Sequence, residues 1–424
     1  MLNNPKWKYL IICIAVLYII VSFIIHMPVS TQRQLFGTII MDEPVYSDFV
    51  ALYNSLYMSS NTSTYIAPYI DTGFNYPFIA GFYWGTLTWM TYIISGNMTS
   101  STALTTFYIM FSFSSSLFYI TVVFLMTSLA TGEYAFSGKR FIIPSILFPS
   151  FIVYLNYDYT IVGVLFLTLG IYLWVRKRFL ISSLFLSLLL MIIPIPASAM
   201  LIGITYCLLI GRREERAKHF LSGLLISLLI MLVVLILLPY SGTSLSSYLA
   251  SMNCKNCLYL LFFRDPDSQY LKAAWLGLIY GITSILLLVD LKNHGDPDTI
   301  LLDRSLLIFS STLIFGIVFI PQYMLYILVA FPLFFARLLD EKAFRLLWIV
   351  LMSDVLNVLI ILLWFKDYEI RSTLSFLGIP LRYSPWTLDS PIQWIAQTRN
   401  ILLVISLLVV YWSTLRLGDT RDKY

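Results

Sequence analysis

Charged residues are scarce in this chain. They make up 12% of its 424 residues, whereas a typical soluble globular protein carries about 25%. Hydrophobic residues account for 59% and form long runs that contain almost no charge. A run of about 20 apolar residues is long enough to cross a bilayer as a helix. The composition therefore excludes an ordinary soluble protein. It predicts an all-α, polytopic membrane protein with a single membrane-embedded domain over residues 1–424.

Histidine and cysteine are also rare, with three and four residues respectively. Cys254 and Cys257 form a lone CxxC, and without further Cys or His nearby this is poor evidence for a zinc site. On the outer side of a membrane, a local disulfide and free thiols remain the alternatives. We therefore expect no cofactor, and the sequence does not support a divalent metal. The net charge of +5 is spread between the apolar runs, so no basic face predicts a nucleic acid partner.

Twelve apolar runs are candidate membrane spans. The segment 77–95 has nearly the right length as well, but it is crowded with aromatic residues, which favour the membrane–water interface. If this segment lies on the surface, most basic residues fall on the same side as the N-terminus, including the run at 176–178. The positive-inside rule then places both termini in the cytoplasm. The twelve spans cover approximately residues 8–27, 103–130, 141–157, 159–175, 179–195, 197–211, 219–240, 271–291, 304–320, 322–337, 343–365 and 398–415.

The longest connections between these spans lie on the outer face in this topology. They comprise residues 28–102, 241–270 and 366–397, whereas the inner connections are short and basic. Such asymmetry favours a function on the outer face, with substrates that arrive through the bilayer. We expect the plasma membrane of a prokaryote, or the endoplasmic reticulum membrane in a eukaryote, with membrane lipids as partners.

The first of these loops, residues 28–102, concentrates acids, tyrosines and turn residues. Its apolar residues recur at helical spacing and predict an amphipathic helix that begins at Pro44 and lies on the outer leaflet. The apolar positions of this helix are Val45, Phe49, Leu52 and Leu56.

Asp48 lies close behind the predicted start of this helix. Unpaired N–H groups at a helix start favour an ionised carboxylate, and a fixed, ionised carboxylate can act as a general base toward a hydroxyl group. The simpler alternative is that Asp48 only satisfies the helix start. Asp42 and Glu43 compete for the catalytic role, or merely solvate the loop.

Other polar and aromatic residues on the expected outer face are candidates for substrate binding. Tyrosine offers a hydroxyl group and a ring face, both of which suit sugars. Interface anchoring, loop solvation and helix capping are the alternative interpretations. Asp158 belongs to the run NYDY between two spans, and Gln322 follows a proline at the start of another span. The candidates are Tyr46, Tyr69, Asp71, Tyr76, Asp158, Gln322 and Tyr323.

Four short motifs occur in an order that resembles a known group of enzymes. They are YSDF at 46–49, a PY pair followed by a YP pair within 68–77, NYDY at 156–159 ahead of a span that ends in RKR, and PQYMLYIL from Pro321. Over about residues 5–415 the chain resembles GT-C glycosyltransferases that use a polyprenyl-phosphate sugar, nearest to glycosyltransferase family 87. It is also similar to the first mannosyltransferases of GPI biosynthesis, whose corresponding segments read Y-T-D and S-Q-Y-F-L-W.

The resemblance implies a GT-C-like fold and a catalytic base in the first outer loop, which carries over onto Asp48. Surface helices build the site in this superfamily, which supports a surface position for 77–95. The eukaryotic pattern continues as D-x-D, but Phe49 and Val50 follow Asp48 here, so metal dependence is unsupported. Family 87 chains often carry a lysine after the fifth span, where this chain has the run IPIP at 193–196.

Recognition of a donor phosphate must therefore come from another basic residue. Arginine is favoured because its planar guanidinium can bind two phosphate oxygens at once. Arg371, Arg382 and Arg399 belong to or follow the last outer loop, and Arg264 is their main rival. Arg382 ranks first, because prolines at 380 and 385 stiffen its surroundings.

The functional expectation is an inverting transfer of a sugar, with mannose as the first expectation, at the outer face of the membrane. The donor would be a polyprenyl (dolichyl) phosphate sugar, and the acceptor a lipid-linked molecule or a glycan. The alternative is a flippase or exporter of a lipid-linked sugar, which predicts charged residues along a transmembrane path, where we find chiefly Asp354. A noncatalytic scaffold would leave the acids and tyrosines of the first loop unexplained.

Overall fold

The structure is a computed structural model that describes residues 5–131, 146–210, 214–240, 242, 256–263, 268–290, 297–335, 340–364, 366–376, 378, 388 and 390–421. Within these ranges the chain forms helices and no strand, apart from an isolated β-bridge between Pro68 and Thr72. The all-α prediction is confirmed for this part of the chain.

The described helices occur in the following order along the chain. The first part of the chain contains α1 (Pro5–Ile25), α2 (Val29–Phe36), α3 (Asp48–Tyr53), the π-helical η1 (Asn54–Ser59), α4 (Phe78–Ser95) and α5 (Ser101–Thr131). The middle part contains α7 (Pro149–Tyr154), α8 (Thr160–Val175), α9 (Phe179–Leu188), η3 (Leu189–Met191), α10 (Pro194–Ile210), α11 (Glu214–Leu237) and α13 (Tyr259–Phe262). The last part contains α14 (Gln269–Asp290), α15 (Pro297–Ile314), η4 (Pro321–Tyr323), α16 (Met324–Phe335), α17 (Asp340–Trp364), α18 (Asp367–Phe376) and α19 (Pro391–Arg421).

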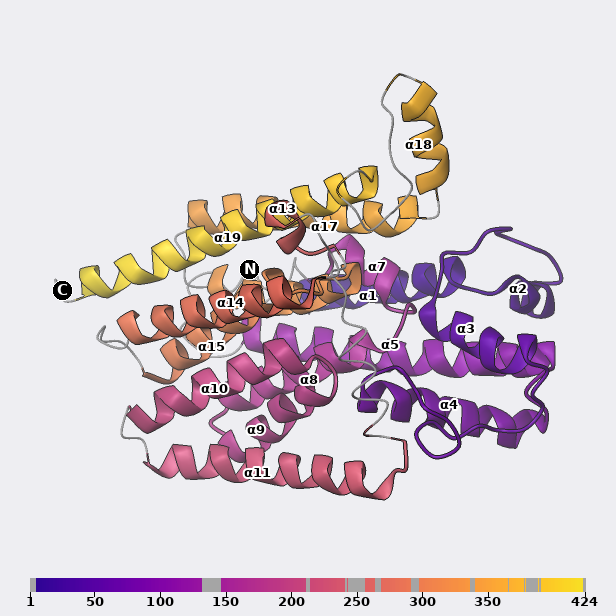
Figure 1. Ribbon diagram of the computed structural model, residues 1–424, viewed down its shortest axis with the longest axis horizontal. Coiled ribbons are helices and arrows are strands. Elements are labelled where there is room, and N and C mark those ends of the chain that lie inside the picture. Colours follow the sequence, from indigo (N-terminus) through magenta and orange to yellow (C-terminus); the bar gives the residue numbers. More distant parts are fainter. Residues whose placement is uncertain are drawn as a thin grey trace.

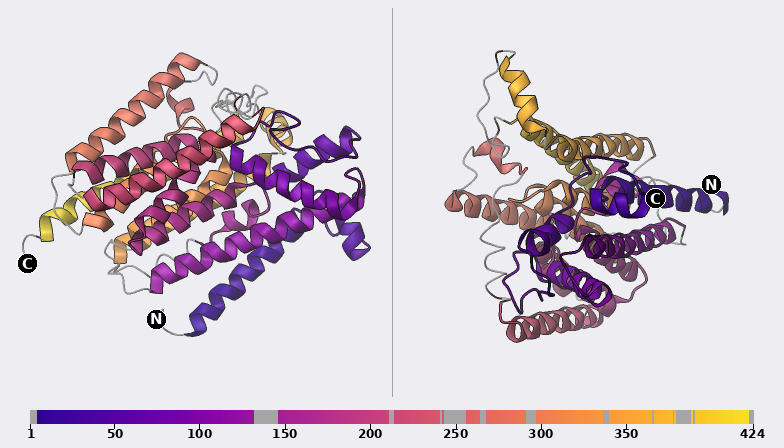
Figure 2. Two further views of the ribbon diagram at one scale, coloured as in Figure 1. Left: turned by 90° about the horizontal axis from the view of Figure 1, so that it is seen from below. Right: turned by 90° about the vertical axis from the view of Figure 1, so that its right-hand side faces the viewer.

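The long helices run side by side along the longest axis of the molecule (Figure 1). Helices α2, α3 and α4 gather at one end, and α18 projects away from the bundle near that end. Helix α1 begins, and α19 ends, toward the opposite end (Figures 1 and 2). The segment that carries Asp48 is therefore presented at the end of the bundle that holds the long first loop.

Several helices are long and apolar enough to cross a membrane. Among the described residues four helices qualify singly, and the pair Tyr9–Ile25 and Val29–Phe36, bent by 112°, forms a fifth candidate. Other apolar helices have 10–17 residues, such as Thr160–Val175. The described residues thus agree with a membrane protein, but they do not bear out a count of twelve spans or a GT-C fold. The four single helices are Ser101–Ala130, Glu214–Leu237, Lys342–Trp364 and Pro391–Trp412.

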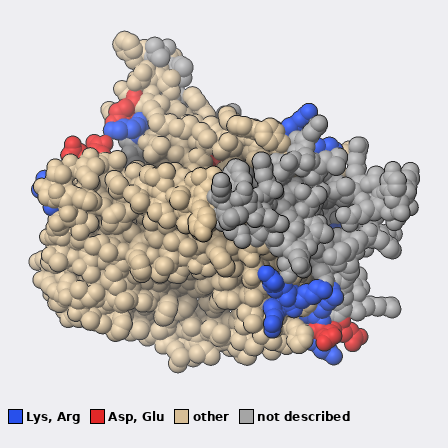
Figure 3. Space-filling model, turned by 180° about the vertical axis from the view of Figure 1, so that it is seen from behind, with Lys and Arg blue, Asp and Glu red and all other residues tan. Residues whose placement is uncertain are grey.

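The surface has the polarity that a membrane protein requires. On the face shown in Figure 3, the described surface is almost free of charge over its central part, and charged side chains gather near its margins. Helix α11 exposes an extended apolar surface, and large exposed apolar patches mark contacts with lipid or protein. The exposed residues of α11 are Leu225, Ile226, Leu228, Leu229, Ile230, Leu232, Val233, Ile236 and Leu237.

One predicted span does not form as a single helix. Of residues 141–157, those from 146 on are described, and only the six residues of α7 among them are helical. Residues 155–159 form turns instead. Asn and Asp side chains compete for backbone hydrogen bonds, which favours turns and helix starts over helix interiors. Accordingly, Asp158 accepts a hydrogen bond from the N–H of Thr160 at 2.8 Å, at the start of α8.

The predicted helix of the first loop starts later and faces inward. Residues 44–47 are not helical, and α3 begins at Asp48 rather than at Pro44. Phe49, Tyr53 and Tyr57 are fully buried. The rings of Phe49 and Tyr53 pack on residues of α5, with ring centroids 4.8–5.2 Å apart. The apolar face is therefore covered by protein, because the aromatic side chains find partners on α4 and α5 before they reach lipid.

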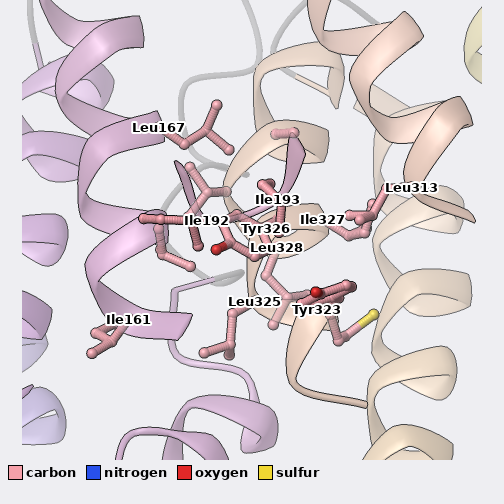
Figure 4. Packing of buried hydrophobic residues seen from close by; sticks show 14 of the residues in the cluster. Ile161, Leu167, Ile192, Ile193, Leu313, Tyr323, Leu325, Tyr326, Ile327 and Leu328 are labelled. Atoms are coloured by element: carbon pink, nitrogen blue, oxygen red, sulfur yellow. The ribbon is translucent and has the colours of Figure 1, made fainter. Parts of the chain in front are cut away.

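Close packing of α8 against α16 fixes the region around η4. Figure 4 shows Leu325, Tyr326 and Leu328 of α16 among apolar residues of neighbouring helices, including Ile161 of α8. A Cβ atom at Gly163 would lie 2.0 Å from the hydroxyl oxygen of Tyr326. Only glycine permits this approach, and α16 follows directly on the turn that carries Gln322.

Cysteine labelling tests the predicted position of α4. Asn61 and Asn97 are exposed on either side of this helix, and Lys177 is exposed between α8 and α9. With Cys13 replaced by serine, we expect Asn61→Cys and Asn97→Cys to react with an impermeant maleimide in intact cells. Lys177→Cys should react only after permeabilisation, because basic connections face the cytoplasm. Reaction of Lys177→Cys from outside, with Asn97→Cys protected, would instead place α4 across the membrane.

Candidate functional site

Asp48 and Asp158 belong to distant segments of the chain, and hydrogen bonds between their neighbouring residues join these segments. The hydroxyl of Ser47 donates a hydrogen bond to the C=O of Tyr157 at 3.0 Å. The N–H of Phe49 donates to the same oxygen at 3.5 Å. The residues on both sides of Asp48 therefore contact the residue that precedes Asp158. This contact brings the start of α3 against the turn between α7 and α8.

The charges of Asp48 and Asp158 act on the same tyrosines, Tyr76 and Tyr157. Burial raises the pKa of Tyr76 well above its ordinary value, and the negative charges of Asp48 and Asp158 raise it further. The pKa of Tyr157 is raised in the same way, by burial and then by Asp48. The ring centroid of Tyr46 lies 5.9 Å from that of Tyr157. Burial, together with the charge of Asp48 and a hydrogen bond to it, raises the pKa of Tyr46 to about 12. These phenols remain hydrogen-bond donors at neutral pH.

Asp158 is the more deeply buried of the two acids. It is 2% exposed, whereas Asp48 is partly exposed. Besides Thr160, its carboxylate accepts a hydrogen bond from the side-chain amide of Gln322 at 3.3 Å. Burial raises its pKa to about 6, although these hydrogen bonds act in the opposite direction. The site therefore pairs one partly exposed carboxylate with one whose pKa is raised by burial.

The structure brings four of the predicted substrate-binding residues together. Tyr46, Tyr76 and Asp158 lie around Asp48, and Gln322 reaches Asp158 from the η4 turn. Tyr323 follows Gln322 but is buried in the apolar core. These residues come from segments of the chain that are far apart in sequence.

Tyr69 and Asp71 stabilise the first loop rather than facing the acids. The hydroxyl of Tyr69 donates to the C=O groups of Tyr76 and Pro77 at 2.9 and 3.0 Å. Tyr69 holds a φ of +65°, which is uncommon for a residue with a side chain. The exposed Asp71 accepts a hydrogen bond from the N–H of Ala67 at 2.7 Å. Tyr69 thus holds the backbone at Tyr76 through the hydrogen bonds of its hydroxyl group.

Asp42 and Glu43 lie on the exposed part of the same loop. The carboxylate of Glu43 lies 3.5 Å from the ammonium group of Lys366. Neither acid is among the charges that act on Tyr76 or Tyr157. Of the three candidate bases, Asp48 is the one that the described residues place among the tyrosines.

Of the four arginines predicted to bind phosphate, the two that the structure describes are buried. Arg371 is buried and forms an ion pair with Asp367, one turn earlier in α18. Arg399 is fully buried, so it does not lie at the membrane surface as predicted. It sits on the inward face of α19, where its guanidinium is hydrogen-bonded to protein groups. Arg264 and Arg382 lie outside the described residues.

Tyr76 also lines an apolar groove. The groove lies between the first loop, the connection from α9 to α10, and α11, and its space of about 480 Å³ is partly open to solvent. The sequence singled out Tyr69 and Tyr76 but not the groove itself, because its other wall residues belong mostly to ordinary apolar runs. A second groove of about 370 Å³ includes Tyr323 and shares Pro194 with the first. The first groove is lined by Tyr69, Tyr76, Pro77, Phe78, Leu190, Met191, Pro194, Met231, Val234 and Leu235.

Cys257 is disulfide-bonded, and Cys254 lies outside the described residues. Among the residues that the structure describes, no group of three or more His, Cys, Asp or Glu side chains is placed to hold a metal ion. Comparison of the sequence with known protein families finds no matching family, and comparison with curated proteins finds no matching protein. The function must therefore be argued from the site itself.

Proposed function

We propose that the protein transfers a sugar from a polyprenyl-phosphate donor to a lipid-linked or glycan acceptor. The observation that carries the proposal is the position of Asp48. Its charge and that of Asp158 act on the same tyrosines, and one of these, Tyr76, also lines an apolar groove. A polar centre beside an apolar groove suits a substrate with a sugar at one end and a hydrocarbon chain at the other.

In this reaction Asp48 acts as the general base. It takes the proton from a hydroxyl group of the acceptor, and the acceptor oxygen attacks the anomeric carbon of the donor sugar. The bond between that carbon and the phosphate oxygen breaks, and the lipid phosphate leaves with the bonding electron pair. Because the attack comes from the face opposite the leaving group, the configuration at the anomeric carbon is inverted.

The neighbouring groups orient the sugar. Asp158 and the amide of Gln322 offer an acceptor and a donor for sugar hydroxyls, and the hydroxyls of Tyr46, Tyr76 and Tyr157 offer further donors. The leaving phosphate requires a cation. Arg382 and Arg264 remain the predicted candidates for this role, since Arg371 and Arg399 are engaged with protein groups.

The hydrocarbon chain of the donor occupies the groove that Tyr76 lines. The far wall of this groove is formed by Met231, Val234 and Leu235 of α11, the helix with the large exposed apolar surface. A chain that enters from the bilayer would thus stay in apolar surroundings up to its phosphate. The proposed site faces the outer side of a prokaryotic plasma membrane, or the lumen of the endoplasmic reticulum, with both termini cytoplasmic.

A transfer assay in liposomes tests the proposal. We expect label from polyprenyl-phosphate mannose, or secondly glucose, to appear in an acceptor, and no transfer from a nucleotide sugar. Shortening the donor chain to one isoprene unit should raise KM for the donor, because each buried CH₂ contributes about 0.8 kcal/mol. Movement of an intact lipid-linked sugar across the bilayer, without transfer, would instead favour the flippase alternative.

A further inference from the structure

A buried polar cluster lies next to the candidate site and is not part of it. Arg399 of α19 and Asn357 of α17 are both fully buried. The guanidinium of Arg399 donates to the side-chain oxygen of Asn357 at 2.6 Å and to that of Asn400 at 2.8 Å. It also lies over the ring of Phe319, 4.3 Å from its centroid. Groups of this kind are costly to bury unless they are fully hydrogen-bonded.

The cluster holds the turn that carries Gln322. Asn357 uses its side-chain amide to donate to the C=O of Pro321 at 2.8 Å. Arg399 donates to the C=O of Phe319 at 3.0 Å. The two carbonyl groups on either side of Ile320 are thus fixed from the bundle interior, immediately before the residue whose amide bonds to Asp158.

The same cluster holds the segment that leads to Asp158. The amide of Asn357 also donates to the hydroxyl of Ser150 at 3.0 Å, at the start of α7. At the other end of α7, the hydroxyl of Tyr154 donates to the backbone oxygen of Asn357 at 3.1 Å. Asp354, one turn before Asn357, accepts a hydrogen bond from the N–H of Ser150 at 3.0 Å. Helix α7 is therefore tied to α17 at both of its ends.

We propose that Asn357, held in place by Arg399, is a positioning residue for the Asp158–Gln322 pair. Its two amide protons go to the two segments that supply this pair, one to α7 and one to η4. Each segment is fixed relative to α17, and the two are thereby fixed relative to each other. The fixing of α7 relative to η4 is inferred from the hydrogen bonds alone. The effect on sugar transfer rests in addition on the proposed function.

The charge of Arg399 fits this role better than a role in phosphate binding. Its acceptors in the described part of the chain are neutral oxygens of Asn256, Phe319, Asn357 and Asn400. Asn400 in turn donates to the backbone oxygen of Asn256 at 2.8 Å, which ties the segment beside Cys257 to the same cluster. A phosphate would have to displace these partners from a site without solvent access.

The variant Asn357→Asp tests the proposal. The new carboxylate still accepts a hydrogen bond from Arg399, and it can accept one from the hydroxyl of Ser150. It has no proton to donate to the C=O of Pro321, so that hydrogen bond is lost. We expect kcat for sugar transfer to fall about 10²-fold, the size that a displacement of about 1 Å can cause. KM for the lipid donor should change less than threefold, because the cluster contributes no residue to the groove at Tyr76. Asn357→Ser lacks the reach to Pro321 and serves if the first variant does not fold.

Ser182→Ala is the matched control. Ser182 is equally buried and donates to the C=O of Gly170 at 2.7 Å, between α8 and α9. It should leave kcat within twofold of the unmodified protein. Hydrogen exchange gives a readout that does not depend on activity. Exchange of the backbone amides of Thr160 and Tyr323 should accelerate in the Asn357 variants and not in the control.

The two readouts separate failure of this inference from failure of the proposed function. If the unmodified protein transfers no sugar, the proposed function fails, and hydrogen exchange alone decides the positioning role. Unchanged exchange at Thr160 and Tyr323 in a folded Asn357 variant would overturn the inference. An unchanged kcat, or an effect confined to KM, would overturn its catalytic part.

Discussion

Replacing Asp48 by asparagine should abolish most sugar transfer while the protein still folds. The amide has nearly the same size and can still accept the hydrogen bond of Tyr46, but it cannot take a proton from the acceptor. Loss of a general base typically lowers a rate by about 10²–10⁴-fold. The measurement is turnover of polyprenyl-phosphate mannose in liposomes, with the thermal unfolding midpoint as the check on folding.

Asp42→Asn and Glu43→Gln provide the comparison. Both acids are exposed on the same loop, and we expect either change to leave turnover within a few-fold of the unmodified protein. Near-normal turnover in Asp48→Asn, combined with a collapse in one of the other two, would move the base to that residue. The geometry around Tyr76 would then need a different explanation.

The chemistry of the candidate site could be predicted from sequence where it depends on local structure. An acid at a helix start, as for Asp48, and an acid in a turn between apolar segments, as for Asp158, are visible in short stretches of sequence. The hydrogen bonds from Ser47 and Phe49 to the C=O of Tyr157 are not, because they depend on how α3 packs against the turn before α8. The pairing of Asp158 with Gln322 depends on tertiary packing in the same way.

The wrong and missing parts of the prediction have a similar cause. An arginine near the start of an apolar helix is usually interpreted as snorkelling to the interface. Arg399 points inward instead, because Asn357, Asn400 and Phe319 offer acceptors there. The helix expected from Pro44 starts at Asp48, and its aromatic residues pack on α5 rather than facing lipid. The groove lined by Tyr76 is made by packing of the first loop against helices that look ordinary in sequence.

The other large expected effect is a gain in stability. Replacing Asp158 by asparagine should stabilise the protein at neutral and alkaline pH. Burial raises the pKa of Asp158 from its ordinary value of 3.8 to about 6, so the folded protein binds this proton more tightly than the unfolded chain does. Stability is therefore lost as the pH rises through about 4 to 6, where the buried carboxyl group must ionise.

Asparagine cannot ionise, and it can still accept the hydrogen bond from Thr160 while Gln322 reverses its amide to match. A pKa that moves from 3.8 to about 6 corresponds to about 3 kcal/mol, at about 1.4 kcal/mol for each pKa unit. We expect Asp158→Asn to be more stable than the unmodified protein by up to about this amount at pH 8, and by progressively less toward pH 4. Denaturant unfolding in detergent over this pH range measures the difference.

The exposed Asp71 offers the matched control for this experiment. Asp71→Asn makes the same chemical change on the first loop at a solvated position, and it should alter the free energy of unfolding by no more than about 0.5 kcal/mol at any pH. Equal stability of Asp158→Asn and the unmodified protein at pH 8 would mean that the Asp158 carboxylate is neutralised in the folded state. A cationic side chain would then have to lie beside the Asp158 carboxylate, and Arg382 and Arg264 would be the first candidates.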